Sequence, residues 1–262
     1  EDCRAVGSIP DEFEILFVQG GATLQFAMQA MNFLGEGRTA NYLDTGVWTS
    51  KAIQEANKIG NVHVAFDGSQ TNYDHCPTDD EIDAVEHAPY LHYCSNNTIY
   101  GTRYANVPSS DSPVICDMSS EMFSRAIQWS KLSMVYAGAQ KNLGTAGTVL
   151  VVIRKEMLDT CPDTLPLLLN YKVLAQKGSC LNTPPTFGIY MMGQVFRWIL
   201  EEGGLQAIED RNELKASMGY DALDSCDDFY TIFAKDGSKS RMNISFKSKT
   251  PETDAMFLEE AA

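Results

Sequence analysis

The chain has 262 residues, of which 44% are hydrophobic, and this length allows one large domain with a smaller one beside it. The formal net charge of -15 argues against a nucleic-acid surface, because binding to a phosphate backbone needs a basic stripe. No apolar stretch is long enough to span a bilayer, and the cysteines and histidines lack the spacing of a metal site, so we expect a cytoplasmic protein that binds neither membrane nor metal.

Predicted strands alternate with predicted helices along the chain, and this alternation indicates an α/β fold. Apolar runs predict strands at residues 15–18, 62–66, 90–94, 114–116, 134–137 and 148–153. Apolar or amphipathic patterns predict helices at residues 24–34, 46–57 and 186–202. A capping-box pattern predicts a further helix from residue 78.

Two glycines, Gly203 and Gly204, follow the last long helix and mark a predicted domain boundary. We expect a large cofactor-binding domain over residues 1–202 and a partial small domain over residues 203–262. The second region is more polar, with one helix and two strand-like runs at residues 229–233 and 242–246. It ends on the helical string "FLEEAA" without a closing signal, so we expect this domain to be incomplete.

A single lysine, Lys141, lies between two apolar strands. Gln140 and Asn142 beside it are compact and uncharged, and Gly144 and Gly147 after it let the backbone approach a bulky group. An amine at the end of a buried strand can be desolvated enough to attack an aldehyde and form a Schiff base. The alternative is an ordinary lysine on an exposed loop, which is the commoner case.

Asp117 ends a predicted strand, at the carboxyl end where open α/β sheets bind their ligands. A carboxylate in that position can hold a proton on a ring nitrogen and so strengthen an electron sink. Because Ser119, Ser120 and Glu121 follow directly, Asp117 is equally consistent with an aspartate that caps a helix or a turn. The sequence leaves both interpretations open.

Other features are consistent with a flat, phosphorylated ligand. Residues 20–23 link a strand to a helix, and the helix N-terminus there can bind a phosphate, although the turn is also an ordinary connection. Trp48 begins the next helix, where it can stack on a flat ring or pack in the core. Thr98, Asn182 and Thr183 offer hydroxyl and amide groups that bind a ligand or satisfy turns. Together with Asp117 and Lys141, these are the parts that a pyridoxal phosphate enzyme needs.

Several long strings carry a family resemblance. They are "ILFVQGGATLQFAMQAMNFL", "DTGVWTSKAIQEANKIGNV", "YLHYCSNNTIYGT" and, most specifically, "VYAGAQKNLGTAGTVLVVIRKEML" and "LNTPPTFGIYMMGQVFRWILEEGG". On these strings the chain resembles the phosphoserine aminotransferases, which are fold-type I, class V pyridoxal phosphate-dependent enzymes. The resemblance implies a large domain with a mixed, mostly parallel sheet and helices on both faces. It also implies an incomplete small α+β domain at the C-terminal end.

The resemblance assigns the central site residues by motif. Lys141 is the implied catalytic residue and carries pyridoxal 5'-phosphate covalently through its amine. Asp117 is implied to pair with the pyridine nitrogen, Trp48 to stack on the ring, and Thr98 to contact the side of the ring that bears the hydroxyl. No metal is implied.

The phosphate site is also implied by the resemblance. Ala22, Thr23 and Gln140 are implied to hold the cofactor phosphate, with threonine at position 23 where some family members have arginine. Asn182 and Thr183 look like the pair that reaches the neighbouring subunit's site, which implies a homodimer with two sites at its interface.

The implied activity is transamination in serine biosynthesis, in which 3-phosphohydroxypyruvate and glutamate become O-phosphoserine and 2-oxoglutarate. Relative to the family pattern, the chain starts after a segment with a His-Arg pair and stops before a segment with a substrate-binding arginine. We therefore expect a complete cofactor site and an incomplete substrate site. The alternatives are a non-catalytic or truncated homologue that dimerises without turnover, a related small-substrate aminotransferase, and a cysteine desulfurase-like enzyme, for which Cys226 is the only late candidate.

Overall fold

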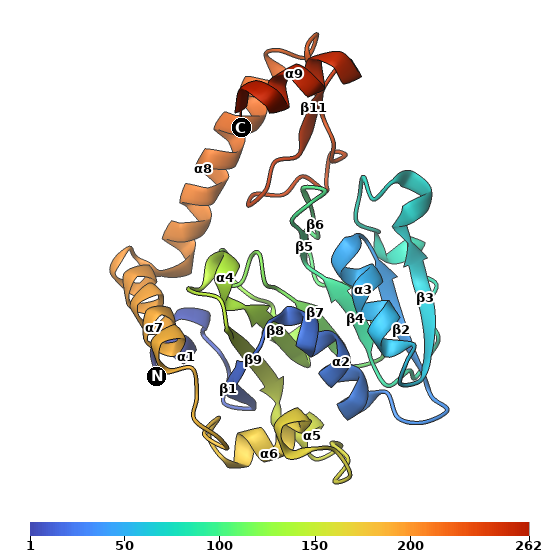
Figure 1. Cartoon of the computed structure of the whole chain (residues 1–262), viewed down its shortest axis with the longest axis vertical. Coiled ribbons are helices and arrows are strands. Elements are labelled where there is room, and N and C mark those ends of the chain that lie inside the picture. The colour runs from blue at the N-terminus through green and yellow to red at the C-terminus, as the bar shows by residue number, and fades with distance from the viewer. Residues whose placement is uncertain (262) are drawn as a thin grey trace.

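A seven-stranded sheet forms the centre of the computed structural model, which describes residues 1–261 (Figure 1). The strand order across the sheet is β1-β9-β8-β7-β4-β2-β3. The strands are β1 (Phe13–Gln19), β2 (Thr39–Asp44), β3 (Asn61–Asp67), β4 (Leu91–Cys94), β7 (Val114–Asp117), β8 (Met134–Gly138) and β9 (Thr148–Arg154).

The sheet is mixed and mostly parallel. β9 runs antiparallel to both of its neighbours, β1 and β8, whereas β8, β7, β4, β2 and β3 are parallel along the rest of the sheet. The register pairs Cys94 with Asp117 and Asp117 with Tyr136. Parallel pairing in this register brings the carboxyl ends of β4, β7 and β8 to one edge of the sheet.

Helices cover both faces of the sheet, so each face is buried against its own apolar core. The side chains of β9 alternate between the two cores: Val149, Val151 and Ile153 belong to one and Leu150 and Val152 to the other. The first core also contains residues of α2 (Ala22–Phe33), α3 (Val47–Ala56), α5 (Lys155–Leu158) and α6 (Tyr171–Gln176). The second contains residues of α1 (Asp2–Gly7), α7 (Thr186–Glu201) and α8 (Gly204–Asp224).

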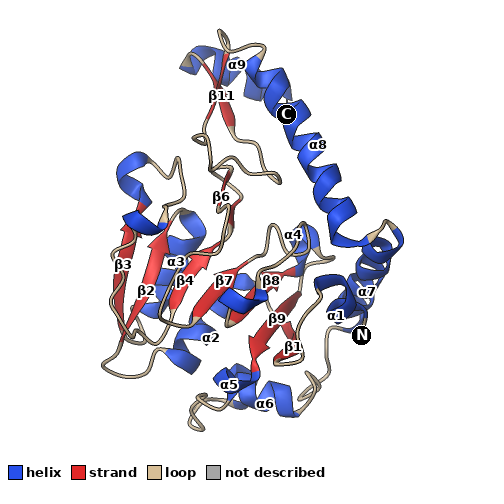
Figure 2. Cartoon of the chain, turned by 180° about the vertical axis from the view of Figure 1, so that it is seen from behind, coloured by secondary structure: helices blue, strands red, loops and turns tan. Residues whose placement is uncertain are grey.

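The C-terminal elements stand above the sheet at the far end of α8, as the view from behind shows (Figure 2). They are β10 (Tyr230–Ile232), β11 (Phe246–Ser248) and α9 (Pro251–Ala261). Gly203 and Gly204 separate α7 from α8 with φ angles of 103° and 80°, which favour glycine. A domain boundary at this point stays a prediction. Within residues 1–261, no helix combines the length and the apolar character needed to cross a bilayer.

A short hairpin contacts the C-terminal segment. It consists of β5 (Asn96–Asn97) and β6 (Thr102–Arg103), in a stretch where the sequence predicts only a loop. The Asn96 amide Nδ2 donates to Asn243 Oδ1 at 2.9 Å, and the Ser245 hydroxyl donates to the Ile99 carbonyl at 2.7 Å. The hairpin is therefore one of the places where the large sheet region and the C-terminal segment are hydrogen-bonded together; the loop at Asp74 and Cys76 is another.

Strand β2 is absent from the sequence-based assignment, because polar residues interrupt its apolar pattern. Asn41 lies in the middle of this strand and is fully buried. Its amide donates to the Val85 carbonyl at 2.8 Å and accepts from the Val85 N–H at 3.0 Å. Backbone groups thus satisfy a side chain that a periodicity argument counts as a surface residue.

Two predicted elements are wrong. The capping box at Thr78 forms, but it opens only a 3-10 turn over Asp79–Glu81, because Ile82 already has extended backbone angles. The strand predicted at residues 242–246 begins instead at Phe246, because the Ser240 hydroxyl accepts the N–H groups of Met242 and Asn243 and makes a turn there. In both cases a short sequence pattern predicted a longer helix or strand than the structure contains.

His92 lies in β4, buried between aromatic side chains. Its Nε2 is 2.8 Å from the Tyr136 hydroxyl, and its ring centroid is 4.9 Å from that of Tyr42. Burial lowers the pKa of His92 from an ordinary 6.5 to about 3, because the interior disfavours the charged imidazolium. The folded protein therefore holds this side chain neutral.

Replacing His92 is expected to make the free energy of unfolding fall less steeply as the pH is lowered. A group whose folded pKa is lowered binds fewer protons in the folded state, so stability is lost as pH falls from about 6.5 towards about 3. The slope contributed by one such group is about 1.4 kcal/mol per pH unit. Urea unfolding across this range is expected to show a shallower loss for His92→Gln than for the parent.

The matched control is His87→Gln, because the His87 side chain is 87% exposed. This variant is expected to keep the parental slope. Equal slopes for His92→Gln and the parent would contradict the neutral, buried state of His92.

Candidate active site

The candidate site lies at the edge of the sheet where the parallel strands end. Figure 1 shows α3, α4 (Ala139–Asn142) and the β5–β6 hairpin along this edge. Thr98 follows β4, Asp117 ends β7, Lys141 follows β8 in α4, and Trp48 follows β2 in α3. Four residues from distant parts of the sequence thus reach one edge, as expected of ligand-binding residues in open α/β sheets.

Lys141 contacts two of the predicted site residues. Its Nζ donates to the Thr98 hydroxyl at 2.9 Å and lies 4.8 Å from the centroid of the Trp48 ring. The second contact is a cation–π interaction, which attracts the ammonium to the indole face. The structure therefore brings Lys141, Thr98 and Trp48 together.

The predicted desolvation of the Lys141 amine does not hold in this structure. β8 is buried along its whole length, but Lys141 itself is exposed, because it lies one short turn beyond the buried end of that strand. The amine is held by Thr98 and Trp48 rather than by burial. The position of Lys141 at the strand end is as predicted, whereas burial as the reason for its reactivity is wrong for this form of the protein.

Asp117 is buried and uses one oxygen for the protein. Its Oδ1 accepts the Ser119 N–H at 2.9 Å and the Ser119 hydroxyl at 2.6 Å. No donor within residues 1–261 contacts Oδ2. Burial raises the pKa of Asp117 above its ordinary value, and the Ser119 hydrogen bonds and the positive charge of Lys141 oppose that shift. Asp117 thus organises a turn, as one of the two sequence interpretations predicts, and its pairing with a ring nitrogen stays a prediction.

Trp48 is fixed at the first turn of α3. The Thr49 hydroxyl accepts the N–H of Gly46 at 3.1 Å, and it donates to the Asp44 carboxylate at 2.9 Å. The indole Nε1 of Trp48 is buried and has no hydrogen-bond partner among the described residues. Trp48 is half-buried and packs against one of the two cores, and its ring also contacts the Lys141 amine.

The predicted phosphate site is the N-terminus of α2. Gly21 is the N-cap, with extended backbone and no side chain to cap the helix, and Ala22 and Thr23 form the first turn. Thr23 is exposed, so the uncapped N–H groups and the Thr23 hydroxyl face outward. Gln140 lies in α4 beside Lys141 and is also exposed. A shared phosphate site of Ala22, Thr23 and Gln140 stays a prediction.

Asn182 and Thr183 do not join this group in their own chain. Both are exposed, in the connection before α7, and the Thr183 carbonyl accepts from the Gln19 amide at 2.8 Å. Along the described chain, no hydrogen bond links either residue to Lys141. A role in a second subunit's site stays a prediction.

Ser119 is the residue that sequence reasoning missed as part of the site. It is buried and binds both the Asp117 carboxylate and the N–H of Gly138. The signal was present as Asp117-Met118-Ser119, an aspartate followed two positions later by a serine, which is typical of a side-chain turn. That pattern had supported only a capping role for the aspartate.

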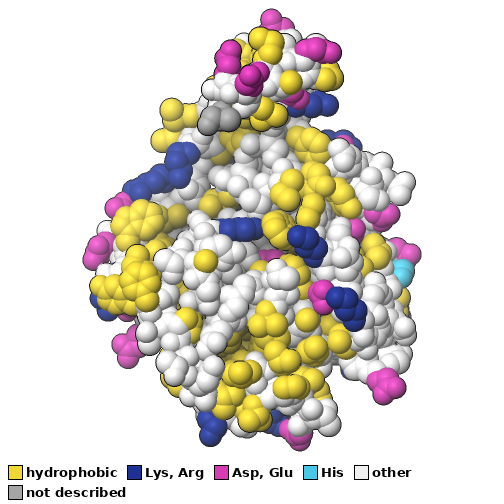
Figure 3. Space-filling model, in the orientation of Figure 1, with side chains coloured by type: hydrophobic (Ala, Val, Ile, Leu, Met, Phe, Trp, Pro, Cys, Tyr) yellow, Lys and Arg dark blue, Asp and Glu magenta, His cyan; other side chains and the backbone are white. Residues whose placement is uncertain are grey.

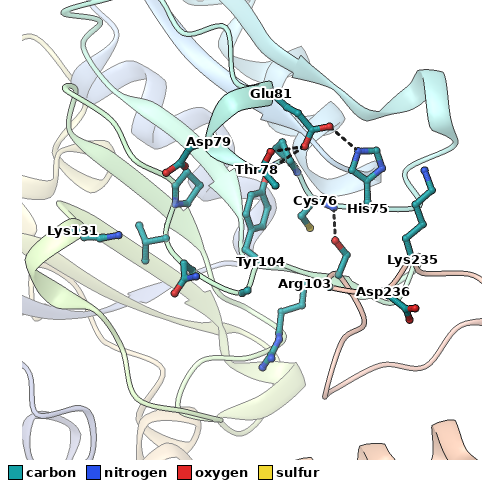
Figure 4. Close-up of a pocket in the computed structure, with 17 residues that line it drawn as sticks. His75, Cys76, Thr78, Asp79, Glu81, Arg103, Tyr104, Lys131, Lys235 and Asp236 are labelled. Atoms are coloured by element: carbon teal, nitrogen blue, oxygen red, sulfur yellow. Dashed lines mark hydrogen bonds and ion pairs between the residues drawn. The ribbon is translucent and has the colours of Figure 1, made fainter.

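A cavity of about 500 Å³ lies elsewhere, between two loops of the sheet region and residues 235–238 of the C-terminal segment. Figure 4 shows His75, Thr78 and Glu81 joined by hydrogen bonds and ion pairs on one side of this cavity, with Lys235 beside them. None of the predicted cofactor residues lines it. Within the described residues, no three His, Cys, Asp or Glu side chains are grouped as a metal ion would require.

Comparisons with known proteins all match aminotransferases. A model of the aminotransferase class-V family matches residues 1–262. Phosphoserine aminotransferase from Desulfotalea psychrophila is 45% identical over 259 residues, which are 99% of this chain and 72% of that protein.

Two solved structures extend the similarity to three dimensions. Phosphoserine aminotransferase from Bacillus circulans subsp. alkalophilus matches with a TM-score of 0.96 at 42% identity, over 99% of this chain and 72% of that one. Phosphoserine aminotransferase from Trichomonas vaginalis, solved with bound pyridoxal phosphate, matches with a TM-score of 0.91 at 37% identity, over 98% of this chain and 74% of that one.

Lys141→Ala is expected to leave the cofactor-free protein nearly as stable as the parent, within about 0.5 kcal/mol, because the side chain is exposed. Asn142→Ala is the neighbouring comparison, since the Asn142 amide donates to the Met122 carbonyl at 2.7 Å. Its loss is expected to cost about 1 kcal/mol. Urea unfolding measures both variants, and a larger loss for Lys141→Ala would show that the amine has a structural role.

Proposed function

The chain belongs to the class V aminotransferase family of pyridoxal phosphate-dependent transaminases, and we propose that it transfers an amino group between glutamate and 3-phosphohydroxypyruvate. The products are O-phosphoserine and 2-oxoglutarate, and the reaction belongs to serine biosynthesis. The fold is that of the fold-type I aminotransferases. The observation that carries the proposal is the meeting of Lys141 with Thr98 and Trp48 at the sheet edge where Asp117 offers a free oxygen.

The residues at this edge fit pyridoxal phosphate. A flat heteroaromatic ring suits stacking on the half-buried Trp48 indole, and a protonated ring nitrogen suits Asp117 Oδ2, which no donor among the described residues contacts. The uncapped N-terminus of α2, with Ala22 and Thr23, suits a phosphate. We assign Gln140 to the phosphate as well, and Thr98 to the side of the ring that bears the hydroxyl.

The bound cofactor supplies an electron sink for the carbon that loses its proton. Lys141 would hold the cofactor through its Nζ, and the same amine, once free, would act as the general base that moves the proton of the substrate Cα. Asp117 keeps a proton on the ring nitrogen. The positive charge of that nitrogen favours the ionised carboxylate, which counteracts the effect of burial on the Asp117 pKa.

The active form in this proposal is a homodimer. Phe187 and Tyr190, in the first two turns of α7, are 68% and 61% exposed, although large apolar side chains are usually buried. They follow Asn182 and Thr183 closely, so one surface offers both apolar contacts and the polar pair. In the space-filling view, apolar side chains gather at the left, where α7 lies, and low on the front (Figure 3). A second copy that covers this surface receives Asn182 and Thr183 at its cofactor phosphate.

A cytoplasmic location is consistent with the cysteines. All seven are free thiols, and five of them are buried. Free buried cysteines are typical of proteins from reducing compartments, where thiols stay reduced.

Lys141 is expected to be the site of covalent cofactor attachment. Reduction of the loaded protein with borohydride and peptide mapping is expected to place the label on Lys141, and Lys141→Ala is expected to lose label and transamination. Lys51→Ala is the matched control, because Lys51 Nζ also lies 4.8 Å from the Trp48 ring. Label on Lys51 instead, or retained in Lys141→Ala, would overturn the assignment.

Subunit mixing tests the proposed role of Asn182. If Asn182 serves the partner's site, a heterodimer of one Lys141→Ala subunit and one Asn182→Ala subunit contains one intact site. Each heterodimer is then expected to have about half of the parental activity, so a fully exchanged 1:1 mixture, in which about half of the dimers are heterodimers, is expected to reach about a quarter. If Asn182 serves its own chain, mixing restores nothing. A mixture of Lys141→Ala with Lys141→Ala carrying a tag is the control, and it stays inactive in either case.

A further inference from the structure

Ser119 occupies a position between the two chemical groups of the candidate site. It follows β7, two residues after Asp117, and is 4% exposed. Its hydroxyl donates to Asp117 Oδ1 at 2.6 Å and accepts the Gly138 N–H at 3.0 Å. Gly138 ends β8 and is the N-cap of α4, the turn that carries Lys141. One hydroxyl thus connects the acid of the site to the start of the segment that bears the amine.

The polarity of these hydrogen bonds is fixed. A hydroxyl has one hydrogen, and an amide N–H can only donate. Because Gly138 N–H donates to Ser119 Oγ, the single Ser119 hydrogen is left for Asp117 Oδ1. The Ser119 N–H also donates to this oxygen, at 2.9 Å. Oδ1 therefore receives two donors, and Oδ2 receives none from the described residues.

We propose that Ser119 is a positioning residue for the cofactor ring: its hydroxyl holds Asp117 Oδ1 so that Oδ2 faces the ring nitrogen, and it keeps this carboxylate in register with the turn that carries Lys141. The inference rests on the proposed use of pyridoxal phosphate. Ser119 acts through Asp117 and does not itself touch the cofactor. Two donors on one carboxylate oxygen also favour its ionised form, which is the form that holds a proton on a ring nitrogen.

The adjacent serine provides a matched control. Ser120 is 7% exposed, and its hydroxyl donates to the Asn96 carbonyl at 2.9 Å and accepts from the Asn96 amide at 2.7 Å. It has no hydrogen bond to Asp117. Ser119→Ala and Ser120→Ala therefore remove the same atom, from neighbouring buried positions, and differ in whether that atom holds the acid.

The test compares pyridoxal phosphate with 1-deazapyridoxal phosphate, in which C–H replaces the ring nitrogen. Equilibrium dialysis gives both dissociation constants for each variant. The parent is expected to bind pyridoxal phosphate at least about tenfold more tightly than the analogue, because a charge-assisted hydrogen bond is lost with the nitrogen. Ser119→Ala is expected to weaken binding of pyridoxal phosphate about five- to tenfold and to leave binding of the analogue unchanged within about twofold.

The controls separate positioning from general damage. A merely structural role predicts that Ser119→Ala weakens both ligands equally, and this result would overturn the inference. Ser120→Ala is expected to keep the parental preference between the two ligands. In an Asp117→Asn background, Ser119→Ala is expected to cause no further loss of preference, because its effect passes through the carboxylate. Additive losses would contradict the inference.

The outcome also distinguishes this inference from the proposed function. If the parent protein binds neither ligand, both the proposed function and the inference about Ser119 are wrong. If the parent prefers pyridoxal phosphate and Ser119→Ala keeps the full preference, the positioning role of Ser119 is contradicted. The transaminase proposal is not affected by that result. Ser119→Thr, which retains the hydroxyl, is expected to restore most of the preference.

Discussion

The parallel pairing of β4, β7 and β8 is the constraint on which the candidate site depends. The register sets Cys94 beside Asp117 and Asp117 beside Tyr136, so the segments that leave these strands start from neighbouring points. Thr98 and Lys141 leave from the two outer strands and meet above the central one. No local sequence feature specifies this meeting. It follows from backbone hydrogen bonding between buried apolar strands, which the two cores hold in place.

Much of the fold was predictable because its strands are apolar and its helices are long. The apolar residues of β1, β4, β8 and β9 predict strands by themselves, and the string around Lys141 indicates the family. β2 escaped prediction because Asn41 is satisfied by a backbone partner far along the chain. The site residues came from the family motif, whereas their contacts came only from the structure. Ser119 was missed because its significance lies in the Gly138 N–H, which belongs to another strand.

The exposure of Lys141 changes the physical account of its reactivity. Burial raises the pKa of Asp117, whereas the Lys141 side chain is exposed. In this form of the protein the amine is oriented by the Thr98 hydroxyl and the Trp48 ring, both of which also fit the proposed cofactor. In the single chain, therefore, contacts and not burial place the Lys141 amine.

The hydrogen bonds around the β5–β6 hairpin tie Thr98 to the C-terminal segment. On one side Asn96 is bonded to Asn243, and on the other the Ile99 carbonyl is bonded to Ser245. Thr98, which receives the Lys141 amine, lies between these two attachments. Any rotation of the C-terminal segment would pull on both flanks of Thr98 at once, and through Thr98 on the Lys141 amine that donates to it.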